Sequence, residues 1–139
     1  MPSNLRFVLI LLGLAAVSAP VSVAVLHRED TQAARINAEA MTGGNAARGK
    51  AALDRYGCKA CHLMALTSGP NGAVGPSLSD IAIRAHIDGK FANTPANMIA
   101  WLRFPQRLDP GCGMPDQALT EAEARDIAAY LYTLRQRSG

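Results

Sequence analysis

The sequence predicts an all-α protein in which an N-terminal apolar helix precedes one small helical domain. Three observations support this class. Residues 7–26 carry no charge, helix-forming segments alternate with Gly- and Pro-rich loops in the rest of the chain, and no run of alternating β-branched residues predicts a strand. The chain of 139 residues is the size of one domain, and its net charge of only +3 does not indicate nucleic-acid binding.

Residues 1–26 contain the predicted apolar helix. Phe7 to Leu26 is twenty residues long, which at about 1.5 Å per residue crosses a hydrocarbon core of roughly 30 Å. We favour an uncleaved signal anchor in the cytoplasmic (inner) membrane, with Arg6 on the cytoplasmic side and the domain facing the periplasm. The alternative is a cleaved signal peptide, read at the small residues Ser22 and Ala24, which would leave a soluble periplasmic protein.

Residues 27–45 are polar and lack a periodic apolar face, so we expect a linker between this helix and a domain that covers residues 46–139. The last helix of the domain is the clearest. Thr120 and Glu123 predict a capping box, and an apolar stripe with helical spacing begins at Ile127. The helices that we expect are Ala46–Tyr56, Leu78–Ala85, Pro95–Arg103 and Thr120–Arg137.

Cys58, Cys61 and His62 form a C-x-x-C-H motif. At this spacing two thiols attach to the vinyl groups of a haem and the next histidine ligates its iron. We therefore expect one haem c, bound covalently. A redox-active disulfide is an alternative, but it would follow a β-strand, and the preceding residues are helix-forming. A zinc site is another, but it needs two further ligands, and the remaining cysteine and histidines are isolated in the sequence.

Met114 is the candidate sixth ligand of the iron. It lies in a turn-rich loop, residues 110–115, directly before the last helix. The other methionines lie outside the domain, on an expected helix, or too near His62 to reach the opposite face of a haem. With His62 and Met114 both bound, the iron has no open position, which predicts an electron carrier and not an enzyme. The alternative is a haem peroxidase or gas sensor, but only His86, which we expect in a surface turn, is available as a distal acid or base.

Residues 49–134 resemble a class I c-type cytochrome. The likeness is strongest to the cytochrome c domain of haem-copper oxidase subunit II, in the run Asn93 to Gln106. The resemblance implies a cytochrome c fold, in which helices pack around one covalently bound haem. It also implies that the first helix of the domain crosses the last, with Gly49 meeting Ile127 where glycine lets the two backbones approach.

The same resemblance implies roles for three further residues. The carbonyl of Pro76 would accept a hydrogen bond from Nδ1–H of His62, which leaves Nε2 for iron. Arg84 would lie beside a haem propionate, and Trp101 would line the haem near the methionine. Cys112 departs from the family, which usually has a small hydroxyl residue there. We expect its thiol to be buried and inert, the alternative being an intermolecular pairing.

Electron transfer on the periplasmic side of a respiratory chain is the predicted function. The expected partners are the membrane and redox proteins: a quinol-oxidising complex, a dehydrogenase or a terminal oxidase. The chain as the haem subunit of a periplasmic dehydrogenase complex is an alternative. Partners would approach the exposed haem edge, and the basic residues available for docking are Lys59, Lys90, Arg103 and Arg107.

Overall fold

A long N-terminal helix, α1, spans Ser3–Thr42 and passes Pro20 without ending. The computed structural model describes residues 3–64 and 72–135, and these divide between two compact units, one ending at Ala33 and the other beginning at Ala34. Within the described part of the chain, Asn4–Thr42 is the one segment long and apolar enough to cross a membrane, a test that a signal sequence also meets.

The segment that we expected as a linker is helical as far as Thr42. Ala34, Ala38 and Thr42 lie four residues apart on one face of α1 and are 8%, 1% and 1% exposed. The carbonyl of Thr42 accepts a hydrogen bond from Nη1 of Arg125 at 2.9 Å. The end of α1 therefore packs within the second unit. Composition did not reveal this face, because alanine and threonine do not stand out as an apolar stripe.

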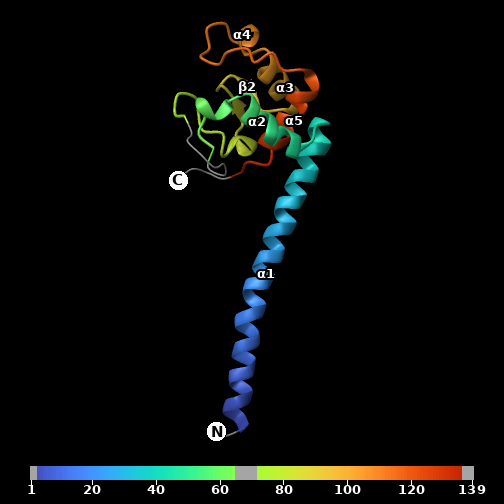
Figure 1. Cartoon of the computed structure of the whole chain (residues 1–139), viewed down its shortest axis with the longest axis vertical. Coiled ribbons are helices and arrows are strands. Elements are labelled where there is room, and N and C mark those ends of the chain that lie inside the picture. Colours follow the sequence, from blue (N-terminus) through green and yellow to red (C-terminus); the bar gives the residue numbers. More distant parts are fainter. Residues whose placement is uncertain (1–2, 65–71, 136–139) are drawn as a thin grey trace. The chain divides into compact units, whose positions relative to one another are not determined.

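The centre of the second unit is a crossing of α2, Ala46–Arg55, with α5, Glu121–Leu131 (Figure 1). A Cβ atom at Gly49 would lie 1.9 Å from the carbonyl oxygen of Asp126 and 3.0 Å from the nitrogen of Ile127. Only glycine permits this approach, so the crossing that the resemblance implied is confirmed. α3, Pro95–Arg103, packs against α5 and has the bounds that we expected.

Asp126 ties the start of α2 to α5. Its carboxylate accepts hydrogen bonds from the backbone N–H of Asn45 at 2.7 Å and from Nε and Nη2 of Arg48 at 2.7 and 2.8 Å. Burial raises the pKa of this carboxyl, but the hydrogen bonds from Arg48 and Asn45 outweigh burial, so the pKa lies below its ordinary value. The ionised carboxylate is therefore part of the helix crossing.

The capping box expected at the start of α5 is confirmed. The N–H of Glu123 donates to Oγ1 of Thr120 at 3.3 Å, and the N–H of Thr120 donates to Oε2 of Glu123 at 3.1 Å. The helix ends at Leu131, earlier than expected, and beyond it the carbonyl of Leu134 accepts a hydrogen bond from the N–H of Ala82 at 3.1 Å. The predicted end of this helix at Arg137 lies outside the described residues.

The expected helix at Leu78–Ala85 is wrong. This segment contains only a short 3-10 helix, η2, at Ile81–Ile83, after which Arg84 is extended. The side-chain amide of Asn93 donates to the carbonyls of Ile81 and Arg84 at 2.7 and 2.9 Å. These carbonyls are thus bonded to a distant residue, which competes with the bonds of a regular helix.

A small hairpin follows this segment. Strands β1, His86–Ile87, and β2, Phe91–Ala92, pair in antiparallel fashion. The turn expected at Asp88 and Gly89 is confirmed, since both have positive φ, at 53° and 67°. Strands of two residues are too short to show an alternating pattern, so the sequence did not predict them. His86 is exposed, as we expected.

Candidate haem site

α2 leads directly into the turn that carries the C-x-x-C-H motif. Gly57 takes a left-handed conformation, with φ of 67°, before the 3-10 helix η1, Cys58–Ala60. The N–H groups of Cys61 and His62 both donate to the carbonyl of Cys58, at 3.3 and 3.0 Å. Because side chains three residues apart eclipse one another in a 3-10 turn, the two thiols lie on one side of it. The turn therefore presents two thiols together with the adjacent imidazole.

The thiols of Cys58 and Cys61 are free and differ in exposure. Cys58 is half-buried against the hydrophobic core, where burial raises the pKa of its thiol, whereas Cys61 is exposed. This pair suits a ligand that lies partly in the core and partly at the surface.

Across residues 3–64 and 72–135, no three His, Cys, Asp or Glu side chains gather for a metal ion, so the zinc alternative gains no further ligand there.

His62 is oriented by the segment that faces it. Its Nδ1–H donates to the carbonyl of Pro76 at 2.8 Å, the hydrogen bond that the resemblance implied. This bond fixes the tautomer and leaves the lone pair of Nε2 for a metal. A Cβ atom at Gly75 would lie 2.7 Å from Cε1 of His62, so the backbone lies directly against the ring.

Backbone hydrogen bonds hold the two segments around His62 together. The N–H of Gly75 donates to the carbonyl of Cys61 at 2.8 Å, and the N–H of Leu78 donates to the carbonyl of Leu63 at 2.9 Å. The residues directly before and after His62 are therefore both bonded to the segment that also accepts the hydrogen bond from its ring. The structure thus brings together four of the predicted site residues: Cys58, Cys61, His62 and Pro76.

Met114 lies in a loop that packs on the same core as Cys58. The loop joins α4, Pro105–Leu108, to α5, and Met114 is half-buried in it. Nε2 of Gln106 donates to the carbonyls of Cys112 and Met114 at 2.6 and 2.8 Å. The sequence did not predict these two bonds of Gln106. Its separations of six and eight residues from these carbonyls match no regular element, so only its place in a polar turn region could have drawn attention.

Arg84 lies close to the segment around Pro76, which accepts the hydrogen bond from His62. Its Nη2 donates to the carbonyl of Ser77 at 2.6 Å and also bonds Asp80. A guanidinium has five N–H donors in a planar fork, so Arg84 retains donors for a second carboxylate. The side chain therefore suits the predicted role beside a propionate and also fixes the chain next to Pro76.

Trp101, predicted to line the haem, and Cys112, predicted to be a buried thiol, both lie near the hydrophobic core. Trp101 is buried on α3, with its ring centroid 5.8 Å from that of Phe91. Cys112 is half-buried and free, less buried than we expected, and its Sγ lies 3.3 Å from Nε2 of Gln106 and 3.6 Å from the carbonyl oxygen of Met114. Both side chains pack within or against the core that also contacts Cys58 and Met114.

The donor set at these positions fits a c-type haem. Two free thiols and an imidazole with an available Nε2 stand on one turn, and a thioether stands in a loop on the same core. Thiols form the covalent attachment, and imidazole with thioether is an axial pair typical of electron carriers. The residues that would hold haem are Cys58, Cys61, His62 and Met114.

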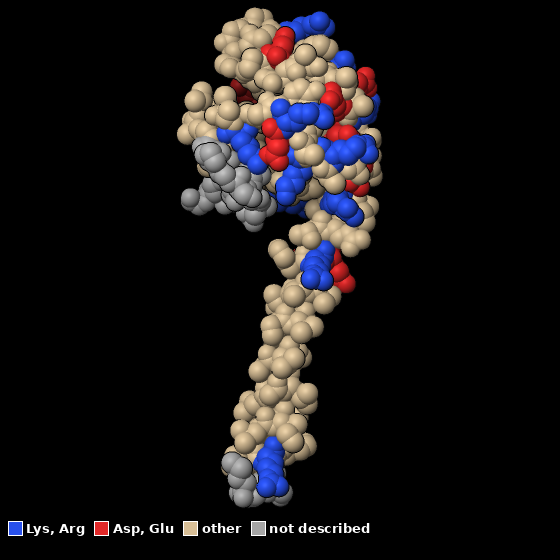
Figure 2. Space-filling view, viewed as in Figure 1, with Lys and Arg blue, Asp and Glu red and all other residues tan. Residues whose placement is uncertain are grey.

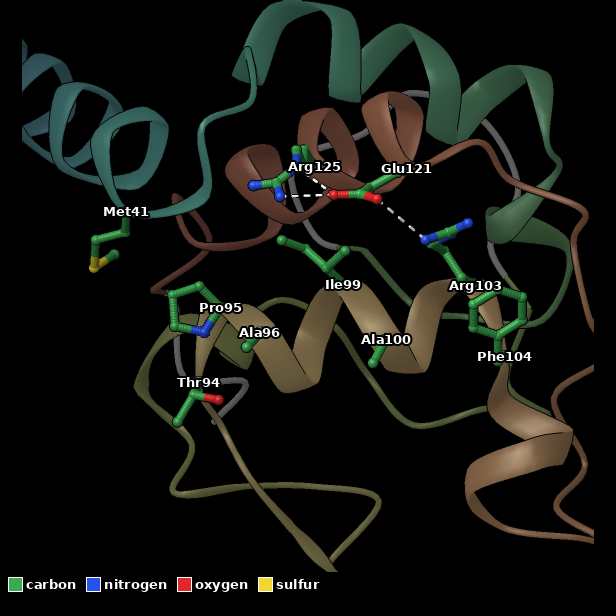
Figure 3. A pocket seen from close by; sticks show the side chains of 10 residues that line it. All are labelled: Met41, Thr94, Pro95, Ala96, Ile99, Ala100, Arg103, Phe104, Glu121 and Arg125. Carbon is green, nitrogen blue, oxygen red and sulfur yellow. Dashed lines mark hydrogen bonds and ion pairs between the residues drawn. The ribbon is translucent and has the colours of Figure 1, made fainter.

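A separate cavity of about 590 Å³ opens along α3, α5 and the end of α1 (Figure 3). Glu121 lies between two guanidinium groups: it accepts hydrogen bonds from Arg125 at 3.2 and 2.7 Å, and it pairs with Arg103 at 3.5 Å. The bond from Arg125 lowers the pKa of Glu121. Arg103 also stacks over Phe104, 4.6 Å from the ring centroid. None of the predicted haem-site residues lines this cavity.

On the globular part of the chain, charged residues of both signs are interspersed over the face shown in Figure 2. Three of the four basic residues expected for docking have acidic partners: Lys59 pairs with Asp54, Lys90 with Asp109, and Arg103 with Glu121. These pairs offset the positive charge at three of the four positions. Electrostatic steering of a partner should accordingly be modest, which agrees with the small net charge.

Comparison with known proteins gives a consistent result. The model of the family described as "Cytochrome c" matches residues 46–135. A "Cytochrome c oxidase subunit 2" from Alkalihalophilus pseudofirmus is 31% identical over 89 residues, which cover 63% of this chain. The chain spans only 25% of the length of that relative.

Proposed function

Because the chain belongs to the cytochrome c family, whose members bind haem covalently and transfer electrons, we propose that residues 46–135 hold a single haem through thioether bonds at Cys58 and Cys61. In this proposal His62 and Met114 would be the protein ligands of the iron. Each cycle takes one electron from a donor protein and passes one electron to an acceptor. The protein is thus an electron carrier and has no substrate-binding position at the metal.

One observation carries the proposal: the hydrogen bond from Nδ1–H of His62 to the carbonyl of Pro76, next to two free thiols. Such a bond is common among histidines, and it is its place beside two thiols that indicates a haem ligand. Here the bond directs Nε2 away from Pro76 and increases its basicity as a ligand. The thiols on the same turn would fix the position of the group that Nε2 binds.

A haem bound here would supply a one-electron couple between ferrous and ferric iron. The residues around it set how readily that couple is reduced. As an iron ligand, Met114 would favour the ferrous state relative to a second histidine. Trp101 and the rest of the buried core exclude water, which disfavours the extra charge of the ferric state. Arg84 would neutralise a propionate with its remaining donors.

The location and the partners belong to the same proposal. α1 would anchor the chain in the cytoplasmic membrane, with Arg6 inside and the haem domain in the periplasm. An anchor raises the effective concentration of a carrier near membrane complexes. The similarity to an oxidase subunit favours a terminal oxidase as acceptor, with a quinol-oxidising complex or a dehydrogenase as donor. The haem subunit of a periplasmic dehydrogenase complex is the alternative assignment.

The ligand assignment is tested with the absorption spectrum of the ferric holoprotein. We expect the weak band at the red end of the spectrum that reports a methionine sulfur on iron, and no binding of carbon monoxide to the ferrous protein. Met114→Ala should abolish the band, admit carbon monoxide and lower the reduction potential. Met98→Leu is the matched control, because Met98 is a buried core residue on α3 and its replacement should leave the band in place.

The opposite results would reject the proposal. A wild-type protein without the red band that binds carbon monoxide readily has an open iron site, and a peroxidase or gas sensor would then be the better assignment. Loss of the band in Met98→Leu with retention in Met114→Ala would show that the wrong methionine has been assigned.

A further inference from the structure

We propose that Gln106 is a positioning residue that keeps Met114 at the iron by closing the methionine loop, residues 110–119. The proposal rests on the axial ligation proposed above. Nε2 of Gln106 donates to the carbonyls of Cys112 and Met114 at 2.6 and 2.8 Å, so one side chain bonds both ends of the segment Cys112–Met114. The second of these acceptors is the backbone of the ligand itself.

The methionine loop depends on this side chain because its own backbone bonds are few. Within the described part of the chain, no hydrogen bond joins a backbone group of residues 113–119 to another backbone group. The N–H of Cys112 reaches the carbonyl of Asp109 at 3.1 Å, but that turn lies before Met114. Ala118 has a positive φ of 52°. A residue such as alanine adopts this backbone conformation at some cost in energy. Local backbone structure therefore does little to close the loop.

The chemistry of an amide fits this task better than that of other side chains. A glutamine has two N–H donors and one carbonyl acceptor. The two donors match the two carbonyls, and Oε1 accepts the N–H of Gly111 at 3.4 Å. The backbone N–H of Gln106 also donates to Oδ1 of Asp116, at 3.4 Å. Gln106 thus contacts the loop on both sides of Met114.

Gln106 is itself held in place. It occupies the second position of α4, directly after Pro105, which is fully buried. The N–H groups of Arg107 and Leu108 both donate to the carbonyl of Phe104, at 3.1 Å. A donor fixed to a buried turn restrains a loop more than a donor on a mobile segment would, because less side-chain freedom is lost when the bonds form.

The expected consequence is a shift in the equilibrium between closed and open loop. An external ligand such as imidazole binds ferric iron only where methionine has left, so its apparent affinity reports the open fraction. Without the bonds from Gln106, the open loop should be more populated. We expect at least about a tenfold gain in imidazole affinity, which corresponds to about 1.4 kcal/mol, in the range for losing one or two hydrogen bonds.

The experiment is an imidazole titration of the ferric holoprotein, followed at the red band. Gln106→Leu removes both donors, and Gln106→Glu keeps the shape while placing an acceptor against two carbonyls. Gln117→Leu and Gln117→Glu are the matched controls, because Gln117 is in the same loop and its side-chain amide donates to the carbonyl of Pro115, two residues before it, at 3.3 Å, and not to that of Met114. We expect both Gln106 variants to bind imidazole at least about tenfold more tightly than wild type, and both controls to stay within about twofold.

Unfolding in guanidinium, measured on the same proteins, separates positioning from general stability. If the Gln106 variants unfold more easily but bind imidazole as wild type does, the proposal is overturned, since Gln106 would then be structural only. Equal gains in affinity for the Gln106 and Gln117 variants would also overturn it. Should neither Gln106 variant retain haem, Gln106→Asn decides: the shorter amide reaches fewer acceptors and should give an intermediate gain, whereas no gain overturns the proposal. A wild-type protein without the red band would instead reject the ligand assignment.

Discussion

The two segments that supply the proposed axial ligands are built differently. The turn of His62 is held by backbone bonds, with Cys61 and Leu63 bonded to the segment around Pro76. The loop of Met114 is held mainly by one side chain, that of Gln106. Backbone bonds survive most substitutions, whereas a side-chain bond is lost with a single mutation. We therefore expect the histidine side of the site, His62 with residues 75–78, to be a fixed wall that does not move. The methionine side should be the one that opens.

The largest effect is expected where the fixed wall itself is disturbed. In Gly75→Ala, the new Cβ would lie 2.7 Å from the ring of His62, and the bond from Gly75 N–H to Cys61 resists a backbone shift. We expect a loss of about 3 kcal/mol in the free energy of unfolding, from overpacking. Guanidinium unfolding of the ferric holoprotein measures it.

Gly89→Ala is the control for this experiment. A Cβ atom there meets nothing within 4 Å, but φ is 67°, so its cost should be only the conformational penalty of about 1 kcal/mol. If Gly75→Ala lost no more free energy of unfolding than Gly89→Ala, the backbone around His62 would have moved to admit the new Cβ atom. The histidine side would then not be more rigid than the methionine side.

Acid should weaken the crossing of α2 with α5, to which Asp126 contributes. The pKa of Asp126 is lowered in the folded state, so its contribution to stability is present above the unfolded value of about 3.9 and is lost as the pH falls through the lower folded value. Asp126→Asn loses the ion pair with Arg48 and should destabilise the protein by about 2 kcal/mol at pH 7.

The pH dependence of this difference is the test. The gap in unfolding free energy between wild type and Asp126→Asn should narrow as the pH is lowered below about 4. Arg48→Gln, which removes the other partner, should show the same narrowing. A gap that stays constant between pH 7 and pH 3 would mean that the charge of Asp126 contributes little to the helix crossing.

The smallest effect is expected at the far end of the methionine loop. Thr120→Ala removes the N-cap of α5 and should cost about 1 kcal/mol in the free energy of unfolding, while Thr120→Ser keeps the hydroxyl and should cost less. The red absorption band should persist in both proteins, because α5 anchors the loop without bonding Met114. Loss of the band in Thr120→Ala would show that this cap, as well as Gln106, governs ligation.

Local sequence signals predicted the parts of the fold that are built locally. The capping box of Thr120, the bounds Pro95–Arg103 and the turn at Asp88 depend on neighbouring residues, and all three are confirmed. The motif at residues 58–62 is likewise local, so the candidate thiols and imidazole could be identified from spacing alone.

The features that the sequence did not predict depend on distant residues. The expected helix at Leu78–Ala85 is absent because Asn93 bonds its carbonyls, and Gln106 bonds a loop six and eight residues away. The last turns of α1 pack through alanines, which have no distinctive pattern. A side-chain amide that bonds a remote carbonyl leaves no periodicity, so such bonds become visible only in the structure.

The crossing of α2 with α5 has a consequence for how the protein matures. α2 and the turn of Cys58 precede α5 in the chain, and α5 supplies much of the core. Until α5 arrives, α2 lacks its main packing partner, and Cys58 has no complete core in which to be half-buried. Cys58 is then not shielded by the folded core. Under the proposed covalent attachment, the period before α5 docks is therefore the one in which Cys58 is most accessible.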